Sequence, residues 1–193
     1  MHPEYSVVNL NILIQRMSLE RVNEFLSTFS CPKNKDIENF LKERAVEFSN
    51  KGIARTHLVL KGEGSNMIIL GYYTLANKIL PIPNEDLSNT EKKKYERFGI
   101  LDDNTNIYNI PMPLIAQLGK NFTNGLEKEL DGADLIDDVC KKVAVIQNDL
   151  GGRFVYLECE DNEKLIERYT KKGFRLLKTA KSMSGLVRMA LFQ

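Results

Sequence analysis

The sequence predicts an α/β (α+β) fold, with a mixed central sheet of about six to seven strands flanked by helices. Two patterns carry this prediction. Short apolar runs suited to strands alternate with segments whose apolar residues recur every three or four positions, as on an amphipathic helix. One run, Phe154–Cys159, is almost entirely apolar, as expected for a central strand covered on both faces.

The first half of the chain is expected to form a strand, two helices and a pair of strands. Gly52 falls where the second helix would end. Glycines between the paired strands favour a hairpin turn, and Pro81 and Pro83 are expected to end the second of these strands. In order, these elements are expected at residues 7–14, 18–29, 37–48, 56–60 and 67–79.

The second half is expected to centre on one long helix. That helix opens at Gly132, its apolar residues share one face, and the glycines at 151–152 close it. No linker or repeat divides the chain, so residues 1–193 are expected to form a single domain. The other expected elements are a short surface helix within 84–99, a loop at 102–109, a helix at 162–172, and strands at 113–120, 154–159, 174–178 and 186–191.

Composition excludes several classes of protein. The chain has 193 residues, with 27 Lys and Arg against 26 Asp and Glu, a formal net charge of +1. This total excludes a polycation that coats nucleic acid by bulk charge. No apolar run approaches the roughly 18 residues of a membrane span, and no signal-peptide pattern is seen. Cys31, Cys140 and Cys159 are widely spaced, and with only two histidines they favour reduced core thiols in a cytoplasmic protein over a metal site.

Common catalytic motifs are absent from the sequence. No GxGxxG, GxxxxGK[ST], GxSxG or HExxH occurs. His57 lies in an expected strand, where a solvated or hydrogen-bonded histidine is more common than a catalyst. Glu158, Glu160 and Asp161 are likewise expected to be solvated rather than to act as a general base.

The most informative segment joins the helix expected at 162–172 to the next strand. Asn162 is followed seven residues later by Tyr169, and then by Gly173 and Phe174 at the entry to a strand. This arrangement resembles the GNAT family of CoA-dependent N-acetyltransferases, which carries the same four residue types at the same spacing. The resemblance implies the GNAT fold, acetyl-CoA as cosubstrate and a primary amine as acceptor.

Segments in the first two thirds of the chain resemble one branch of that family, the TacT-type toxins. Toxins of that branch acetylate the amino group of aminoacyl-tRNA and are held by a ribbon-helix-helix antitoxin. The resemblance therefore implies a tRNA acceptor and an antitoxin partner, while a protein amine or a small amine stays open as acceptor. A homodimer is a further possibility that the sequence leaves open. The matching segments are FxC at 29–31, DxxxFLxxxA at 36–45, ART at 54–56, LGYYTLA at 70–76 and PLIAQLG at 113–119.

Acetyl transfer from a thioester requires an N–H donor for the carbonyl oxygen and a proton donor for the leaving thiolate. A glycine inside a strand often marks a bulge, so the backbone N–H of Leu118 is the candidate oxyanion donor, with Gly119 allowing pantetheine to approach. The resemblance places Tyr169 at the thiolate. Packing against Leu165 is the open alternative for Tyr169, because the two residues are at helical i, i+4 spacing.

The pyrophosphate of CoA is suited to backbone N–H groups at a helix N-terminus. Gly132, Ala133 and Asp134 are the candidates here. The loop before them reads EKELDGA at 127–133 and keeps only the last glycine of the family's QxxGxG pattern. Its carboxylates oppose a phosphate, although Lys120 and Lys128 would partly offset them, and simple helix capping is the alternative.

Two further alternatives follow from this loop and from Asn162. Asn162 is expected to contact the cofactor and also to cap the helix that follows it. A loop that departs from the family pattern also fits a second hypothesis, in which a GNAT fold has lost catalysis and serves as a binding or regulatory module.

Charge is unevenly distributed along the chain. Residues 101–150 contain nine acidic and four basic residues, whereas 164–188 contain eight basic residues and one acid. A basic face at 164–188 would suit a polyanion such as tRNA, and a solvated surface is the alternative. The three lysines at 92–94 are expected to lie on a helix surface. The basic residues of 164–188 are Lys164, Arg168, Lys171, Lys172, Arg175, Lys178, Lys181 and Arg188.

Overall fold

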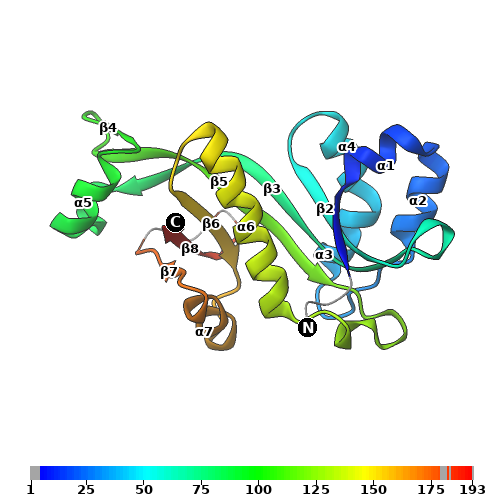
Figure 1. Ribbon diagram of the computed structural model, residues 1–193. Helices are drawn as coiled ribbons and strands as arrows, with labels where there is room; N and C mark the ends of the chain where they lie inside the picture. Colours follow the sequence, from blue (N-terminus) through cyan, green and yellow to red (C-terminus); the bar gives the residue numbers. More distant parts are fainter. Residues whose placement is uncertain (1–4, 179–181, 183, 193) are drawn as a thin grey trace. The chain divides into compact units, whose positions relative to one another are not determined.

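The computed structural model describes residues 5–178, 182 and 184–192. In this part of the chain, eight strands form a mixed sheet in the order β1-β2-β3-β5-β6-β8-β7, with β4 paired to β5, and seven α-helices accompany it (Figure 1). The predicted α/β class is therefore confirmed, with one strand more than the highest number expected. No helix among the described residues is long and apolar enough to cross a lipid bilayer.

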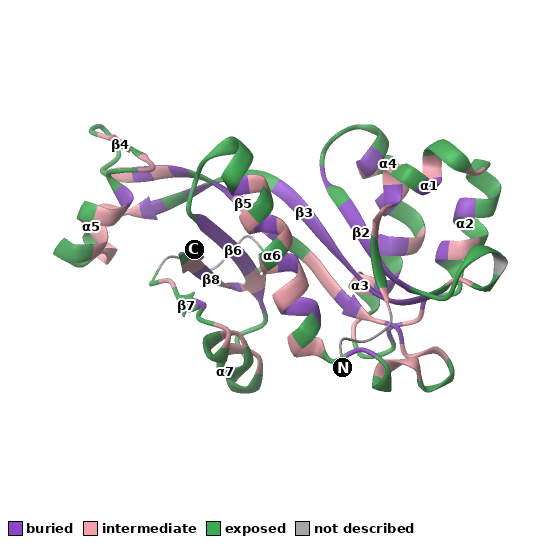
Figure 2. Ribbon diagram, viewed as in Figure 1, coloured by how far each residue is buried: buried purple, intermediate pink, exposed green. Residues whose placement is uncertain are grey.

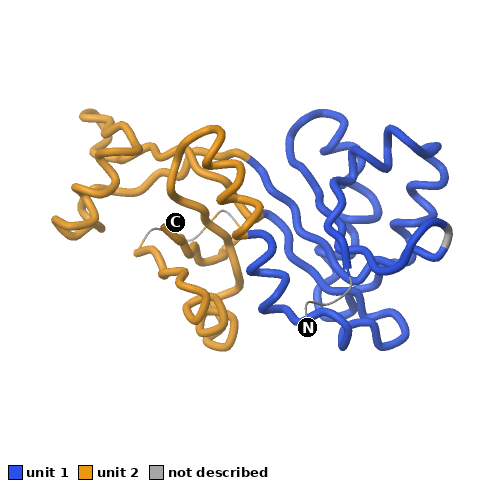
Figure 3. Tube along the Cα trace, viewed as in Figure 1, with its two compact units in different colours: residues 1–76, 116–139 blue, residues 77–115, 140–193 orange. Residues whose placement is uncertain are grey.

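Two compact units make up the chain (Figure 3). Residues 1–76 and 116–139 form the first, and residues 77–115 and 140–193 form the second. Three long elements contribute residues to both units: β3 (Ile68–Pro83), β5 (Ile107–Lys120) and α6 (Gly132–Leu150). The single domain expected from the sequence stays a prediction.

The first unit packs short helices against antiparallel strands. β1 pairs with β2, and β2 pairs with β3, both antiparallel. The elements that belong to this unit alone are β1 (Ser6–Asn9), α1 (Leu10–Arg16), α2 (Leu19–Ser27), α3 (Lys35–Asn39), a π-helical turn (Phe40–Arg44), α4 (Ala45–Asn50) and β2 (Arg55–Lys61). Fully buried side chains from helices and strands meet in its core, among them Leu10, Leu26, Phe29, Leu41, Leu58 and Tyr72.

The strand expected at 7–14 is wrong in its second half. β1 ends at Asn9, whose side chain accepts a hydrogen bond from the Asn11 N–H and caps α1. Leu10 and Leu13 are both buried, three positions apart, as one helical face requires. A continuous apolar run therefore conceals a change from strand to helix that only the cap at Asn9 indicates.

The second unit contains the other half of the sheet. β6 pairs in parallel with β5 and antiparallel with β8, and β8 pairs with β7. Figure 2 shows β6 buried along its length, as its apolar sequence predicted. The elements that belong to this unit alone are α5 (Asn89–Tyr95), β4 (Ile100–Asp102), β6 (Phe154–Cys159), α7 (Glu163–Lys171), β7 (Arg175–Leu176) and β8 (Val187–Phe192).

Two expectations for this unit are wrong. β3 does not end before Pro81, because exposed Pro81 lies between buried Leu80 and Ile82 and so keeps the alternation of a strand. The segment 102–109 is not all loop, since β4 and β5 form a hairpin there. Asn106 turns the hairpin with a φ of 55° and donates its N–H to the Asp102 carbonyl over 2.7 Å.

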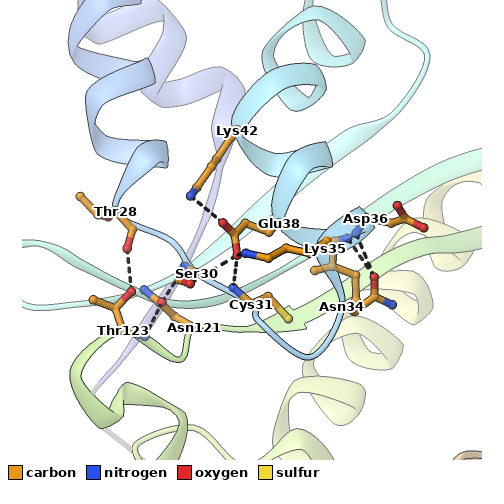
Figure 4. Close-up of polar contacts among 11 residues, drawn as sticks. Thr28, Ser30, Cys31, Asn34, Lys35, Asp36, Glu38, Lys42, Asn121 and Thr123 are labelled. Atoms are coloured by element: carbon orange, nitrogen blue, oxygen red, sulfur yellow. Dashed lines mark hydrogen bonds and ion pairs between the residues drawn. The ribbon is translucent and has the colours of Figure 1, made fainter.

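A buried carboxylate ties the segments of the first unit together (Figure 4). Glu38 of α3 is only 8% exposed. Its oxygens accept hydrogen bonds from Lys42 Nζ (2.9 Å), Lys35 Nζ (3.1 Å) and the backbone N–H of Cys31 (2.8 Å). These bonds, that of Lys42 foremost, favour the charged form and lower the pKa of Glu38 to about 2. The loop that joins α2 to α3 is thus fixed to α3 by one carboxylate.

Replacing Glu38 by Gln should lower the unfolding free energy by about 2 kcal/mol at neutral pH, because both ion pairs are lost. The stabilisation belongs to the carboxylate, whose folded pKa of about 2 lies below its ordinary value of 4.5. It is present above pH 4.5 and is lost as the pH falls toward 2. Urea unfolding at a series of pH values should show the two proteins converging at low pH. Parallel pH profiles would contradict this role.

Candidate active site

One parallel strand pair forms the frame of the candidate site. β5 and β6 pair through Leu114 with Tyr156 and Ile115 with Leu157. α6 lies between these two strands in the chain, so the segment from β5 to β6 is a strand–helix–strand unit. The predicted site residues lie at the end of β5, at the start of α6, and at the cap and last turn of α7, the helix that follows β6.

Gly119 on β5 has a packing role within the first unit. A Cβ atom added there would lie 2.4 Å from Cγ2 of Ile37, and atoms of Phe29 and Tyr72 are within 3.5 Å of it. Helix α3 can therefore contact the strand only because this residue lacks a side chain. Leu118 beside it is half-buried. Its bulge, its oxyanion role and the approach of pantetheine at Gly119 stay predictions.

Lys120 anchors the loop that precedes α6. Its ammonium donates to the carbonyl oxygens of Glu127 (2.5 Å) and Leu130 (2.6 Å). Leu130 is buried and packs so closely on Gly71 that a Cβ there would lie 2.7 Å from Leu130 Cδ2. Lys120 thus fixes the loop conformation, a role that its sequence position did not indicate.

At the start of α6, the Asp131 side chain caps the helix, which was the alternative to phosphate binding. Asp131 accepts the Ala133 N–H on its side chain (2.8 Å) and the Leu135 N–H on its carbonyl (3.1 Å). Glu129 forms an ion pair with Lys61. Gly132, Ala133 and Asp134 do open the helix, but the N–H of Ala133 is already bonded to a carboxylate.

Asn162 and Tyr169 belong to the second unit. The side chain of Asn162 accepts the N–H groups of Lys164 (3.0 Å) and Leu165 (3.4 Å), which confirms it as the cap of α7. Tyr169 is half-buried and meets Phe174 edge to face, with ring centroids 6.0 Å apart. Gly173 between them has a φ of 89°, the left-handed conformation expected where a helix ends.

The Tyr169 hydroxyl holds its proton at neutral pH. Burial, with a smaller contribution from Cys159, raises the pKa of Tyr169 to about 12. A tyrosine in this state can donate a hydrogen bond or a proton to a developing thiolate, and it is a poor base. The hydroxyl is therefore available as a hydrogen-bond donor, whereas the raised pKa makes it a weaker proton donor than an ordinary tyrosine.

Several predicted features change once partners are known. Glu158 is not merely solvated, because it forms an ion pair with Arg188 (3.0 Å) across β6 and β8. Lys171 pairs with Glu167 (2.8 Å), so two of the basic residues of 164–188 are engaged with acids. Lys181 lies outside the described residues.

Two of the predicted core thiols are buried, Cys31 and Cys159, whereas Cys140 is half-buried. His57 is buried and stacks on Tyr73, with ring centroids 4.9 Å apart, which indicates a packed residue. No cluster of residues able to hold a metal ion occurs in the described part of the chain.

The predicted site residues fall into two sets. The first unit holds Leu118, Gly119, Lys120, Gly132, Ala133 and Asp134, and Lys120 links the β5 members of this set to the loop before α6. The second unit holds Asn162 and Tyr169, on the cap and last turn of one helix.

Comparison with known proteins gives a match only at the level of structure. No family model and no curated protein matches the sequence. The chain is similar to AtaT complexed with acetyl-methionyl-tRNAfMet, with a TM-score of 0.71, 19% identity and coverage of 97% of this chain and 94% of that one. It is also similar to a tyrosine-to-phenylalanine mutant of KacT (TM-score 0.66, 21% identity, 96% and 94% covered). AtaTR bound with AcCoA gives a TM-score of 0.64 at 19% identity, with 96% and 92% covered.

This chain has the GNAT fold. The similarity extends over nearly the whole of each chain, and the fold that the Asn162–Phe174 segment suggested is confirmed. In this GNAT fold, the end of β5, the start of α6 and helix α7 carry the predicted site residues.

Replacing Lys120 by Met should loosen the loop at 127–130, because two carbonyl groups lose their charged donor. Amide hydrogen exchange in that loop should become about ten- to a hundredfold faster, since a hydrogen bond to a charged group contributes roughly 1.5–3 kcal/mol. Lys128→Met is the matched control, as Lys128 is an exposed residue of the same loop. Equal exchange rates in the two variants would show that Lys120 is not the anchor.

Proposed function

We propose that this chain is an N-acetyltransferase that transfers the acetyl group of acetyl-CoA to a primary amine by direct attack. The observation that carries the proposal is the combination of the GNAT fold with the Asn162–Phe174 segment. Neighbours of this fold were solved as AtaTR bound with AcCoA and as AtaT complexed with acetyl-methionyl-tRNAfMet. These complexes support acetyl-CoA as cosubstrate and an acetylated amine as product.

In the proposed reaction, the amine nitrogen attacks the thioester carbonyl and forms the amide as the carbon–sulfur bond breaks. The backbone N–H of Leu118 donates to the carbonyl oxygen, which gains negative charge. Tyr169 donates its hydroxyl proton to the departing CoA thiolate. The amine loses a proton to solvent, and Tyr169 regains one, so the exchange balances.

Pyrophosphate binding is proposed at the start of α6. Gly132, Ala133 and Asp134 would offer N–H groups, with Lys120 holding the loop below them and Gly119 admitting pantetheine. Asn162, at the N-cap of the helix that carries Tyr169, would also contact the cofactor. Because the Asp131 carboxylate already accepts from Ala133, it must turn away before that N–H can meet a phosphate.

The acceptor we favour is aminoacyl-tRNA, with a protein amine and a small amine as alternatives. The AtaT structure with acetyl-methionyl-tRNAfMet supports this choice, and the basic residues of 164–188 offer a surface for RNA. Structures of AtaT with its antitoxin AtaR, and of a KacTA–DNA complex, support an antitoxin partner of the ribbon-helix-helix kind. A homodimer and a cytoplasmic location stay predictions.

The Asp131 cap favours a second candidate, a GNAT-fold protein that no longer catalyses transfer and serves as a binding or regulatory module. A carboxylate at the helix start satisfies the N–H group that the cofactor phosphate would need. The two candidates differ in whether acetyl-CoA binds, so binding of the cofactor separates them.

Acetyl-CoA should raise the melting temperature of the wild-type protein. At about 100 times its Kd, it should add about 2.7 kcal/mol to the unfolding free energy. Asp131→Ser keeps a capping side chain but removes the charge, so it should bind acetyl-CoA about tenfold more tightly. Differential scanning fluorimetry measures both effects. Desulfo-CoA, which carries no acetyl group, serves as a second ligand that reports binding without transfer. No shift at millimolar acetyl-CoA in either protein would leave only the binding module.

Tyr169→Phe should lower acetyl transfer by about 10²- to 10⁴-fold, since it removes the proton donor. Acetyl-CoA binding should stay within about twofold, because the ring contact with Phe174 can be kept. Transfer of radiolabelled acetyl groups to bulk aminoacyl-tRNA measures the first effect, and calorimetric titration measures the second. A packing role for Tyr169 would instead weaken binding and stability together.

A further inference from the structure

A groove in the second unit lies between α5 and the end of β8. Its volume is about 430 Å³. Three cations and one aromatic ring line it, and no carboxylate is among its described lining residues. The lining residues are Asn89, Thr90, Lys93, Lys94, Arg97 and Phe192.

The acids of this region are engaged outside the groove. Glu91 accepts from the N–H (2.9 Å) and the hydroxyl (2.6 Å) of Ser88 in a capping box at the start of α5. Glu96 accepts from the Tyr108 hydroxyl over 3.2 Å. These bonds hold the carboxylates at the cap and beside β5. The positive charge of Lys93, Lys94 and Arg97 is therefore not neutralised within the groove lining.

Basic residues of β7 and its following segment lie close enough to α5 to act on its charges. Arg175 and Lys178 both favour the charged form of Glu91, after its bonds to Ser88. Burial lowers the pKa of Lys94, Arg175 lowers it further, and the nearby Glu91 carboxylate partly opposes both effects. Arg175 and Lys178 do not line the groove, but they add positive charge near α5.

Phe192 gives the groove an aromatic wall. Its ring packs on Phe154 (centroids 5.1 Å apart) and on Phe98 (6.2 Å), and the residue stays 43% exposed. The Lys94 ammonium lies 3.5 Å from the centre of the ring. The cation therefore covers one face of the ring, which the aromatic core holds in place, and a base that stacks on this face would displace Lys94 toward a phosphate.

This pairing of features fits single-stranded nucleic acid better than an acidic peptide. Clustered Lys and Arg side chains neutralise phosphates, and an exposed aromatic ring offers a surface on which a base stacks. An acidic peptide would use the cations and leave Phe192 without a role. Asn89 and Thr90 add exposed polar side chains that can donate to phosphate oxygens.

We infer that the groove between α5 and β8 binds a single-stranded segment of RNA, with its phosphates at Lys93, Lys94 and Arg97 and a base against Phe192. The inference deepens the proposed function and rests on it for the identity of the RNA, since an acceptor amine carried by tRNA needs a surface that holds the nucleic acid. The lysines at 92–94 lie on the surface of helix α5, as expected, and two of the three line the groove.

The test compares two double charge reversals by fluorescence anisotropy, with a labelled single-stranded oligoribonucleotide of about 12 residues as the probe. Lys93→Glu with Arg97→Glu removes two exposed groove cations. Lys78→Glu with Lys92→Glu is the matched control, because both lysines belong to the same unit and neither lines the groove. The groove variant should bind about tenfold more weakly, and the dependence of log K on log salt should fall by about 1 for each lost phosphate contact. The control should change affinity less than about twofold.

Phe192→Leu tests the stacking contact separately. It keeps an apolar side chain against Phe154 but removes the aromatic face, so affinity should fall at least about fivefold with little change in salt dependence. Melting temperatures of all variants show whether each one is folded. Equal weakening by both double reversals, or no RNA binding by the wild-type protein, would overturn the inference. Polyglutamate binding that depends on the groove cations but not on Phe192 would overturn it in favour of an acidic protein segment.

Failure of the proposed function can be distinguished from failure of the groove proposal. If acetyl-CoA gives no thermal shift while RNA binding still depends on Lys93 and Arg97, the enzyme proposal fails and the groove stands. If acetyl-CoA binds and is used but the groove variant holds RNA as tightly as wild type, the groove proposal fails alone.

Discussion

The close approach of backbone to side chain at Gly71 and Gly119 is the constraint on which the first unit depends. A Cβ at Gly119 would collide with Ile37 of α3, and a Cβ at Gly71 would meet both Leu130 and the carbonyl oxygen of Gly119 (2.8 Å). Neither glycine has a positive φ, so their need is for space rather than for a special backbone conformation. Helix α3 and the loop before α6 can pack on the same pair of strands only while both positions lack side chains.

The packing at these two glycines also holds the candidate site residues of the first unit in place. Gly119 is flanked on β5 by the proposed oxyanion donor, Leu118, and by Lys120, which bonds the loop before α6. The close packing of β5, α3 and the loop before α6 fixes the backbone at Leu118 and in that loop. Glu38 extends the same rigidity to the segment between α2 and α3, where its carboxylate holds Cys31 and two lysines. Preorganised N–H donors need such a rigid surround, since they act without reorganising during the reaction.

The sequence predicted those features whose causes are local. Asn162 caps α7 and Gly173 ends it, because each depends on neighbours within a few residues. The burial of β6 depends on distant strands, but its apolar run is enough to predict it. Specific contacts between distant residues were missed. The Glu158–Arg188 pair joins residues 30 positions apart, and no residue near Lys120 indicates that it bonds the carbonyls of 127 and 130. The fold was therefore largely predictable, whereas the electrostatics of the site were not.

The structure explains how a chain of near-zero net charge can present a locally positive groove. Several acids form helix caps or ion pairs. Asp131 caps α6, and Glu91 takes part in the capping box of α5. Glu129 pairs with Lys61, and Glu158 pairs with Arg188. A carboxylate so engaged contributes little to the field beyond its partner, whereas an exposed lysine beside an aromatic ring keeps its charge available to a ligand. Equal totals can therefore coexist with a locally positive groove. By the same reasoning, a polyanion that contacts the basic residues of 164–188 would gain further contacts at α5 and β8, where the acids are engaged outside the groove.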